Sequence, residues 1–477
     1  MESRQHTTAH LPTPEALPAH AAEIIAGSRK ETGATHTGWA LINGRSIPAA
    51  DNADDIFRVA SITKSFTASA MLGVIHGLIP ATNPVTLETT VGQFIPGADA
   101  SITAVTIRQL LSMASGLPTD DTWADRVEAM SREEFIELAS SPLLLSADPS
   151  STYTYSNFGY ALIGRAIEYA TGQPFTDIVE QHILGPSGLR QSLFDATSLA
   201  PNTLVRGLHR CRPNKLIEVI PTGPGAFSPI GGLCATMNDL ARWVQQMITA
   251  WKSHTTGWPA VHYEQQHIAN LEKVTTMNGR AVADAYGYGL HVREDEQYGR
   301  FVFHSGGYPG FGSHMLWHPA TELGVVLAGN ITYYPAQKYA EEILYYWLDE
   351  IGYQRSQTPF KGMCPVVESI SVSEQALASA RKVEQLIHTW DDSLADELFA
   401  LNMDLDTERS ARREILQQAC LEGCESNPLE DLRWMSPTEA RWTLRAQPET
   451  VLRMLLNPTG EVSALTLYKP GGSGSVH

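Results

Sequence analysis

Long apolar runs and an excess of positive charge are both absent from this sequence of 477 residues. It carries 34 Lys and Arg against 52 Asp and Glu, a net charge of -18, which argues against nucleic acid and anionic membrane surfaces as partners. No stretch approaches the length that crosses a bilayer, and the first ten residues hold no apolar signal-peptide core. We therefore predict a cytoplasmic protein with no membrane and no nucleic-acid partner.

Cysteine is also scarce, and paired zinc spacings are missing. An odd number of scattered cysteines favours free, structural thiols. His314 and His318 lie four apart on an expected strand without an acidic neighbour, so we predict no metal ion, and we expect no cofactor. The cysteines are Cys211, Cys234, Cys364, Cys420 and Cys424.

Among the residues that are present, Ser61 and Lys64 are the most informative. Residues 56–60 are apolar and strand-like, and residues 61–76 have the pattern of a largely buried helix. Ser61 therefore lies at a strand-to-helix junction, where free N–H groups and the helix dipole favour negative charge. The spacing puts Lys64 on the same helix face. A role as helix N-cap would be enough to explain Ser61. It would not explain Lys64, because a buried ammonium must be paired with a negative group or lose its proton.

Two further motifs follow along the chain. Tyr155 and Asn157, in Tyr-Ser-Asn, stand on a loop just before an expected helix. His304 begins His-Ser-Gly-Gly, whose glycines, Gly306 and Gly307, let a ligand approach the backbone of an inner strand. Together the three motifs supply a nucleophile, proton-handling groups, an amide and a glycine-rich edge, which suits acyl transfer through a serine ester.

This ordered set resembles the serine β-lactamase and penicillin-binding-protein superfamily. Within it, the chain is most similar to the class C-like branch of D-aminopeptidases, DD-carboxypeptidases and family VIII esterases. The resemblance implies an α/β sandwich, that is, an antiparallel sheet flanked by helices plus a helical subdomain, with the active site between the two parts. It covers residues 15 to 352 and includes Thr106–Pro118, Ile230–Trp243, Tyr286–Leu290 and Gly324–Asn330.

The resemblance also implies a role for each motif residue. Ser61 would be the acylated nucleophile, and Lys64 would help to deprotonate it. Tyr155 would relay the proton to the leaving group and later activate the deacylating nucleophile. Asn157 would hold Lys64 and a substrate carbonyl. The N–H groups of Ser61 and Gly307 would form the oxyanion hole.

Two departures from the family pattern change the expected substrate. The chain has no Lys-Ser/Thr-Gly, and His304 takes the place of that lysine. The site would then lack a fixed cation for the carboxylate of a β-lactam or a peptide, unless the histidine is protonated. Met113 stands where many relatives have a histidine. The first departure favours esterase, amidase or aminopeptidase chemistry over β-lactamase chemistry.

We therefore predict a serine hydrolase that acts through a Ser61 acyl-enzyme on a small ester, amide or short peptide. A penicillin-binding-protein-like thioesterase or transacylase of peptide natural products is one alternative. A β-lactamase or DD-carboxypeptidase is another, and a non-catalytic binding protein on this fold is a third. Pocket walls are expected from residues 120–132 and 206–227.

The chain beyond residue 362 changes in composition and predicts a small α+β domain. Residues 373–401 and 407–421 have helical patterns, and three short strands with turn signals follow. A nuclear-transport-factor-2-like or cystatin-like fold fits better than a lipocalin-like barrel, because half of the segment is helical. We expect a packing or dimerisation module, and a homodimer. The predicted divisions are 1–14 flexible N-terminus, 15–353 hydrolase domain, 354–362 linker, 363–470 α+β domain and 471–477 flexible tail.

Overall fold

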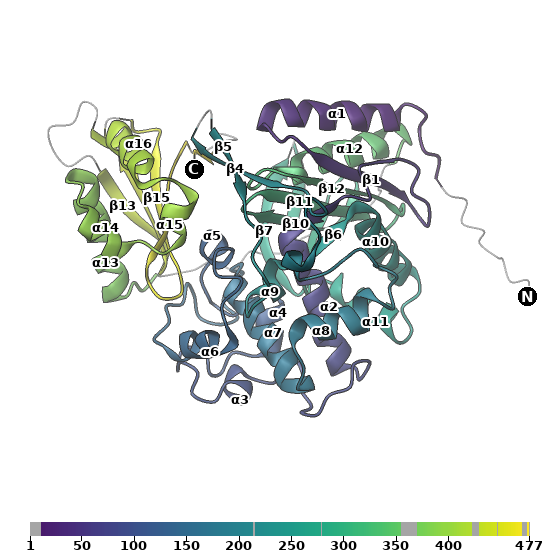
Figure 1. Ribbon diagram of the computed structural model, residues 1–477, viewed down its shortest axis with the longest axis horizontal. Helices are drawn as coiled ribbons and strands as arrows, with labels where there is room; N and C mark the ends of the chain where they lie inside the picture. Colours follow the sequence, from purple (N-terminus) through teal and green to yellow (C-terminus); the bar gives the residue numbers. More distant parts are fainter. Residues whose placement is uncertain are drawn as a thin grey trace, which may run out of the picture.

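The structure, a computed structural model, shows a large body and a smaller C-terminal one (Figure 1). It describes residues 11–212, 215–277, 279–353, 370–421, 429–445, 447–469 and 475–476. The predicted linker, 354–362, lies outside the described residues, as do most of the predicted flexible ends, 1–14 and 471–477. No helix in the described part of the chain is long and apolar enough to cross a membrane.

The large body is built on an antiparallel sheet of eight strands in the order β2-β1-β12-β11-β10-β9-β8-β7. The first strand pairs with one near the end of the domain, with Trp39 opposite Leu327. The strands are β1 (Thr37–Asn43), β2 (Ala50–Asp51), β7 (Asn270–Met277), β8 (Arg280–Tyr286), β9 (His291–Asp295), β10 (Gly299–Tyr308), β11 (Phe311–His318) and β12 (Leu323–Gly329).

Helices cover both faces of this sheet (Figure 1). On one face, Leu41 of β1 belongs to a core cluster with α1 (Leu17–Thr32) and α12 (Ala336–Glu350). On the other face, Ala40 belongs to a cluster with α2 (Thr63–Ile75), α10 (Met237–Lys252) and α11 (Trp258–Gln265). Every residue of β1 is buried, as expected for a strand between two helical layers. The predicted α/β sandwich is confirmed.

A mainly helical subdomain is inserted between β3 (Ile56–Arg58) and β7, near the expected place. Its helix at residues 132–140 begins with a capping box of Ser131 and Glu134. The segment also contains strands that the sequence did not predict. The elements are η1 (Ala60–Ile62), α3 (Val91–Phe94), α4 (Ile107–Leu111), α5 (Asp121–Ala124), α6 (Arg132–Ser140), α7 (Asn157–Thr171), α8 (Phe175–Val179), η2 (Glu180–Leu184), η3 (Ala196–Ser198), β4 (Gly207–Arg212), β5 (Lys215–Val219), α9 (Ser228–Gly231) and β6 (Cys234–Thr236).

The C-terminal body is the small α+β domain that the sequence predicts. It has a five-stranded antiparallel sheet in the order β13-β14-β15-β16-β17 and a core of its own, in which Trp442 packs with helix residues such as Val383. Its elements are α13 (Glu374–His388), α14 (Asp392–Leu398), α15 (Asn402–Asp406), α16 (Arg409–Leu421), β13 (Leu429–Ser436), β14 (Glu439–Leu444), β15 (Val451–Leu456), β16 (Val462–Tyr468) and β17 (Ser475–Val476).

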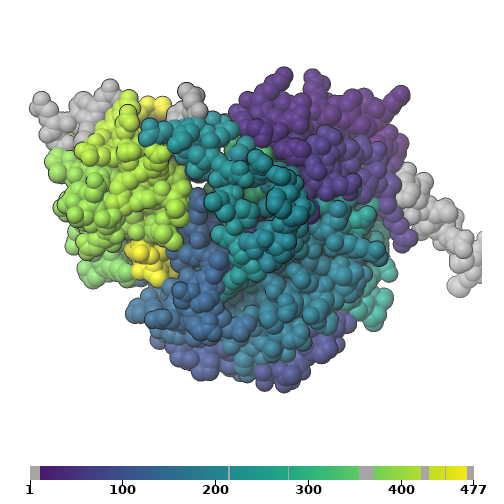
Figure 2. Space-filling model, viewed as in Figure 1, coloured from purple at the N-terminus to yellow at the C-terminus, as the bar shows by residue number. Residues whose placement is uncertain are grey.

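The C-terminal domain lies against the helical subdomain (Figure 2). Hydrogen bonds and an ion pair join the two near helix α5 and the loop that follows α6. They are Thr122 Oγ1 to Ser463 O at 3.1 Å, Arg126 to Asp406 at 2.8 Å, Leu144 N to Pro458 O at 2.8 Å and Ser146 Oγ with Thr438 Oγ1 at 2.5 Å. The domain is thereby held beside the region where the sequence places the active site.

Candidate active site

Ser61 stands in the turn η1, between strand β3 and helix α2, as its sequence context predicts. The preceding Ala60 has a φ of 48°, in the left-handed region that residues with a side chain rarely adopt. Lys64, one turn further, donates from Nζ to Ser61 Oγ at 2.8 Å and to the backbone carbonyl of Ile230 at 2.9 Å. The amine and the hydroxyl are therefore in position for proton transfer.

Burial sets the charge state of Lys64. Its side chain is fully buried, and this desolvation lowers the pKa to about 8, while the charges of Asp121, Asp125 and Asp120 oppose the shift. At pH 7 about one tenth of the molecules would hold the neutral amine, compared with about 1 in 3,000 for an unshifted lysine. The fold thus supplies a base near neutral pH.

Tyr155 lies beside Lys64 and Ser61. Lys64 Nζ is 5.0 Å from the centre of the Tyr155 ring, and the phenol is hydrogen-bonded to Ser61. Burial raises the pKa of Tyr155 well above its ordinary value, and the charge of Asp121 adds to this effect. Tyr155 is therefore a neutral phenol that can pass a proton on, rather than a phenolate base.

Asn157 begins helix α7 close to these groups but has a different partner from the one predicted. Its Nδ2 donates to Asp121 Oδ1 at 2.9 Å, and its backbone N donates to Asp120 Oδ1 at 2.8 Å. Its Oδ1 is buried without a hydrogen-bond partner among the described residues. The expected bond from Asn157 to Lys64 is not formed, because the carbonyl of Ile230 binds the lysine and Asp121 attracts the amide.

His304 on strand β10 is held as a neutral ring. Its Nδ1 donates to the carbonyl of Ser305 at 2.6 Å, so its Nε2 accepts from the hydroxyl of Tyr286 at 3.1 Å. Burial lowers the pKa of His304 well below its ordinary value, and the charges of His291 and Lys64 add to the shift. The residue in the place of the family lysine therefore carries no positive charge near neutral pH.

The two glycines after His304 allow strand β10 to approach the nucleophile closely. A Cβ at Gly306 would lie 2.2 Å from the carbonyl oxygen of Val59, and one at Gly307 would lie 2.3 Å from the ring of Tyr333. Gly307 lines the same cleft as Ser61, which suits the predicted oxyanion hole.

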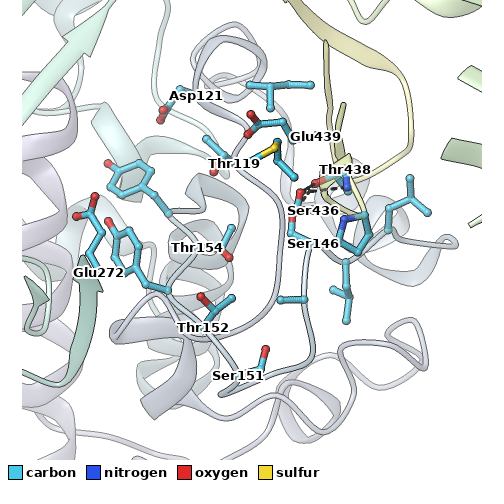
Figure 3. A pocket seen from close by; sticks show the side chains of 18 of the residues that line it. Thr119, Asp121, Ser146, Ser151, Thr152, Thr154, Glu272, Ser436, Thr438 and Glu439 are labelled. Atoms are coloured by element: carbon cyan, nitrogen blue, oxygen red, sulfur yellow. Dashed lines mark hydrogen bonds between the residues drawn. The ribbon is translucent and has the colours of Figure 1, made fainter. Parts of the chain in front are cut away.

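Ser61 lines a cleft of about 1270 Å³. Figure 3 shows other side chains that line this cleft, among them Asp121, Glu272 and Glu439. Ser61, Tyr155, His304 and Gly307 line it, whereas Lys64, Asn157 and Gly306 are not among the described residues of its lining. The predicted wall 120–132 contributes Asp121, but residues 206–227 do not line the cleft in the described structure. The other walls come from segments that the sequence did not indicate: 143–148 and 151–154 of the helical subdomain, and 370–373 and 435–439 of the C-terminal domain.

The charge of the cleft is negative. Asp121, Asp148, Glu272 and Glu439 line it, and no Lys or Arg does among the residues that the structure describes. Glu272 and Glu439 are ion-paired, with Lys273 and with two arginines, respectively. His291, also at the surface of the cleft, has a pKa lowered to about 3 by burial. The cleft therefore offers no fixed cation to an anionic substrate.

Two other histidines, considered as metal ligands from the sequence, lie on strand β11 and bind protein atoms. His314 Nδ1 is 2.9 Å from the hydroxyl of Ser305, and His318 is bound through Nδ1 to Thr321 and through Nε2 to the carbonyl of Tyr298. Within the described ranges, no group of three or more His, Cys, Asp or Glu side chains could hold a metal ion.

Comparison with known proteins gives the family. A family model described as beta-lactamase matches residues 21–345, which is more than half of the chain. The chain belongs to the β-lactamase family. The predicted resemblance to the serine β-lactamase and penicillin-binding-protein superfamily is confirmed.

Two of the curated relatives of this β-lactamase-family chain carry a penicillin-binding-protein and a carboxypeptidase name. It is 25% identical over 277 residues to protein flp of Staphylococcus aureus (58% of this chain, 53% of that protein). It is 26% identical over 285 residues to penicillin-binding protein 4* of Bacillus subtilis (55% and 58%). It is 24% identical over 290 residues to the D-alanyl-D-alanine-carboxypeptidase/endopeptidase AmpH of Escherichia coli (57% and 70%). The chain thus spans just over half the length of the first two.

Solved structures share the fold of this family. An octameric penicillin-binding protein homologue from Pyrococcus abyssi has a TM-score of 0.60 at 17% identity, covering 94% of this chain and 96% of that one. The D-alanine carboxypeptidase AmpC from Burkholderia cenocepacia has a TM-score of 0.55 at 16% identity, covering 70% and 99%. At these identities the likeness concerns the fold alone.

Proposed function

We propose that the protein is a serine hydrolase that forms an acyl-enzyme at Ser61 with a small ester or amide, in the manner of family VIII esterases and D-aminopeptidases. The observation that carries this proposal is the 2.8 Å contact between Lys64 Nζ and Ser61 Oγ, together with a lysine pKa of about 8. A nucleophile needs an adjacent base that is neutral at the working pH.

In the proposed reaction, neutral Lys64 takes the proton of Ser61 as Oγ attacks the substrate carbonyl. The N–H groups of Ser61 and Gly307 stabilise the oxyanion. Tyr155 gives its proton to the leaving group and regains one from Lys64, which leaves the ester at Ser61. Water then attacks the ester, and the same groups return the proton to the Ser61 oxygen.

The charge of the cleft supports an ester or amide without a carboxylate near the scissile bond. β-Lactams and the C-terminal ends of peptides carry a carboxylate. The described lining of the cleft contains no Lys or Arg that could bind this carboxylate. A free ammonium on the acyl part, as in an aminopeptidase substrate, would instead face Asp121. The carboxypeptidase name of the AmpH relative supports the alternative of a DD-carboxypeptidase, which the missing cation disfavours.

Active-site labelling tests the nucleophile. We expect a fluorophosphonate probe, read by mass spectrometry, to modify Ser61 in the folded protein, and we expect Ser61→Ala to lose both labelling and turnover of p-nitrophenyl acetate. An unlabelled Ser61 in folded protein would contradict the mechanism.

A matched substrate pair tests the charge preference. D-Alanine p-nitroanilide should be hydrolysed faster than its N-acetyl derivative, and Asp121→Asn should reduce that ratio. An equal rate for the two anilides would remove the argument from charge. We also propose the homodimer expected from the sequence, and light scattering, which measures the mass of the assembly, tests it.

A further inference from the structure

A second cavity, of about 400 Å³, adjoins the catalytic cleft and extends into the C-terminal domain. Thr119, Asp121, Tyr333 and Leu455 line both spaces. The boundary between the cleft and the second cavity is therefore formed by these side chains, one of them from the C-terminal domain. Ligand sites in proteins usually measure about 300–1,000 Å³, and a cavity of about 150 Å³ already holds a benzene molecule.

The lining of the second cavity is mostly apolar on the side of the C-terminal domain. Its charged groups there are compensated within the protein: Arg453 binds Glu439 in a bidentate ion pair at 3.0 Å, Arg412 binds Asp404 at 3.2 Å, and Asp406 binds Arg126 at 2.8 Å. A charged ligand would have to compete with these pairs, so the lining fits an uncharged, apolar group. The apolar residues are Met403, Ile415, Leu416, Leu455, Ala464, Leu465 and Leu467.

The position of Asp121 indicates which end of a substrate would enter. Asp121 binds the amide of Asn157, the residue expected to hold a carbonyl of the acyl part. Tyr155, expected to protonate the leaving group, lines the cleft but not the second cavity. The boundary that the two spaces share thus lies on the acyl side of Ser61.

We propose that the second cavity binds the apolar acyl chain of the substrate, so that the C-terminal domain determines chain-length specificity. This inference rests on the proposed Ser61 acyl-enzyme. Burial of each methylene would raise kcat/KM by at most about fourfold. We expect a preference for longer chains in the series p-nitrophenyl acetate, butyrate, hexanoate and octanoate, with a ratio of octanoate to acetate of at least tenfold.

The sheet of the C-terminal domain offers a matched pair of variants. Ala464 on β16 is half-buried and lines the second cavity. Thr443 on β14 lies on the same face of the sheet. It pairs with Val451 of β15, Ala464 pairs with Leu455 of β15, and these two β15 residues are an even number of positions apart. Thr443 lines neither the cleft nor the second cavity. Ala464→Phe should fill the cavity and lower the octanoate-to-acetate ratio at least tenfold, with acetate turnover within twofold of wild type. Thr443→Phe should leave the ratio unchanged.

The outcomes separate this inference from the proposed function. Ser61-dependent acetate turnover with no gain for longer chains would refute the acyl-chain cavity and leave the hydrolase intact. An unchanged ratio in Ala464→Phe, or an equal loss in Thr443→Phe, would refute it as well. Absence of Ser61-dependent turnover for every ester would refute the proposed function and this inference together. Melting temperatures of both variants show whether the domain remains folded.

Discussion

Replacing Lys64 by methionine measures how much folding free energy the buried amine costs. The folded protein lowers the pKa of this group from 10.5 to about 8, so the unfolded chain binds more protons between these two values. Stability must therefore rise with pH across this window. The linkage gives a cost of about 3 kcal/mol at pH 7, which falls to about 1 kcal/mol at pH 10.

Methionine has a similar length and no charge, but it loses two hydrogen bonds, to Ser61 and to the carbonyl of Ile230. Their loss offsets roughly 1–2 kcal/mol of the gain and does not depend strongly on pH. Lys64→Met should therefore be inactive, yet about 2 kcal/mol more stable than wild type at pH 7. Near pH 10 this advantage should disappear.

Urea unfolding at pH 7, 8.5 and 10, followed by tryptophan fluorescence, measures the difference. Lys30→Met, at an exposed position on helix α1, is the control and should show no such dependence on pH. A stability difference between Lys64→Met and wild type that stays constant from pH 7 to pH 10 would refute the argument, because the amine would then not be held with a lowered pKa.

Further tests concern the proton path through Lys64 and Tyr155, the close approach of Gly306 to Val59, and the absence of a Lys or Arg from the described lining of the cleft. Tyr155→Phe should slow deacylation more than it slows the attack of Ser61 on an activated ester. The double variant Tyr155→Phe and Lys64→Ala should have a kcat/KM little lower than that of the less active single variant. Additive losses in kcat/KM would contradict a proton path that the two residues share. Gly306→Ala would place a methyl 2.2 Å from the Val59 carbonyl and should cost about 1–3 kcal/mol in unfolding experiments and about 100-fold in kcat/KM. Gly27→Ala, inside helix α1 with nothing within 4 Å, should leave kcat/KM unchanged and stabilise the fold by about 0.5–1 kcal/mol. Nitrocefin should be hydrolysed slowly at pH 8, and efficient turnover would show that a carboxylate needs no fixed cation here.

The sequence predicted the parts of the site that depend on local pattern. Ser61 and Lys64 share one helix turn, and the glycines that follow His304 share one strand, so spacing alone places them together. The partner of Asn157 could not be predicted in this way, because Asp121 is 36 residues away and meets it only after α5 packs against α7. The acidic pair at positions 120 and 121, just before a helix, was the available signal.

Two of the strands that the sequence did not predict, β7 and β13, are exposed and charged. β13 and β7 lie at sheet edges, and residues such as Glu430, Asp431 and Lys273 give them no alternating apolar pattern. Charged edges of this kind discourage pairing with other chains, and they also remove the signal that sequence analysis uses. The contribution of Ser436 to Glu439 to the cleft depends on how two domains dock, which no local pattern encodes.

The pairing of β1 with β12 has a consequence for how the enzyme is made. Thr37 lies opposite Gly329, about 290 residues later, and β1 stands inside the sheet rather than at its edge. At about 5–20 residues per second, a ribosome needs roughly 15–60 s between these two strands. During that time the apolar faces of β1 and of helix α2, which carries Lys64, have no sheet to cover them. The nascent chain therefore has no assembled active site, and it exposes an apolar segment on which chaperones can act.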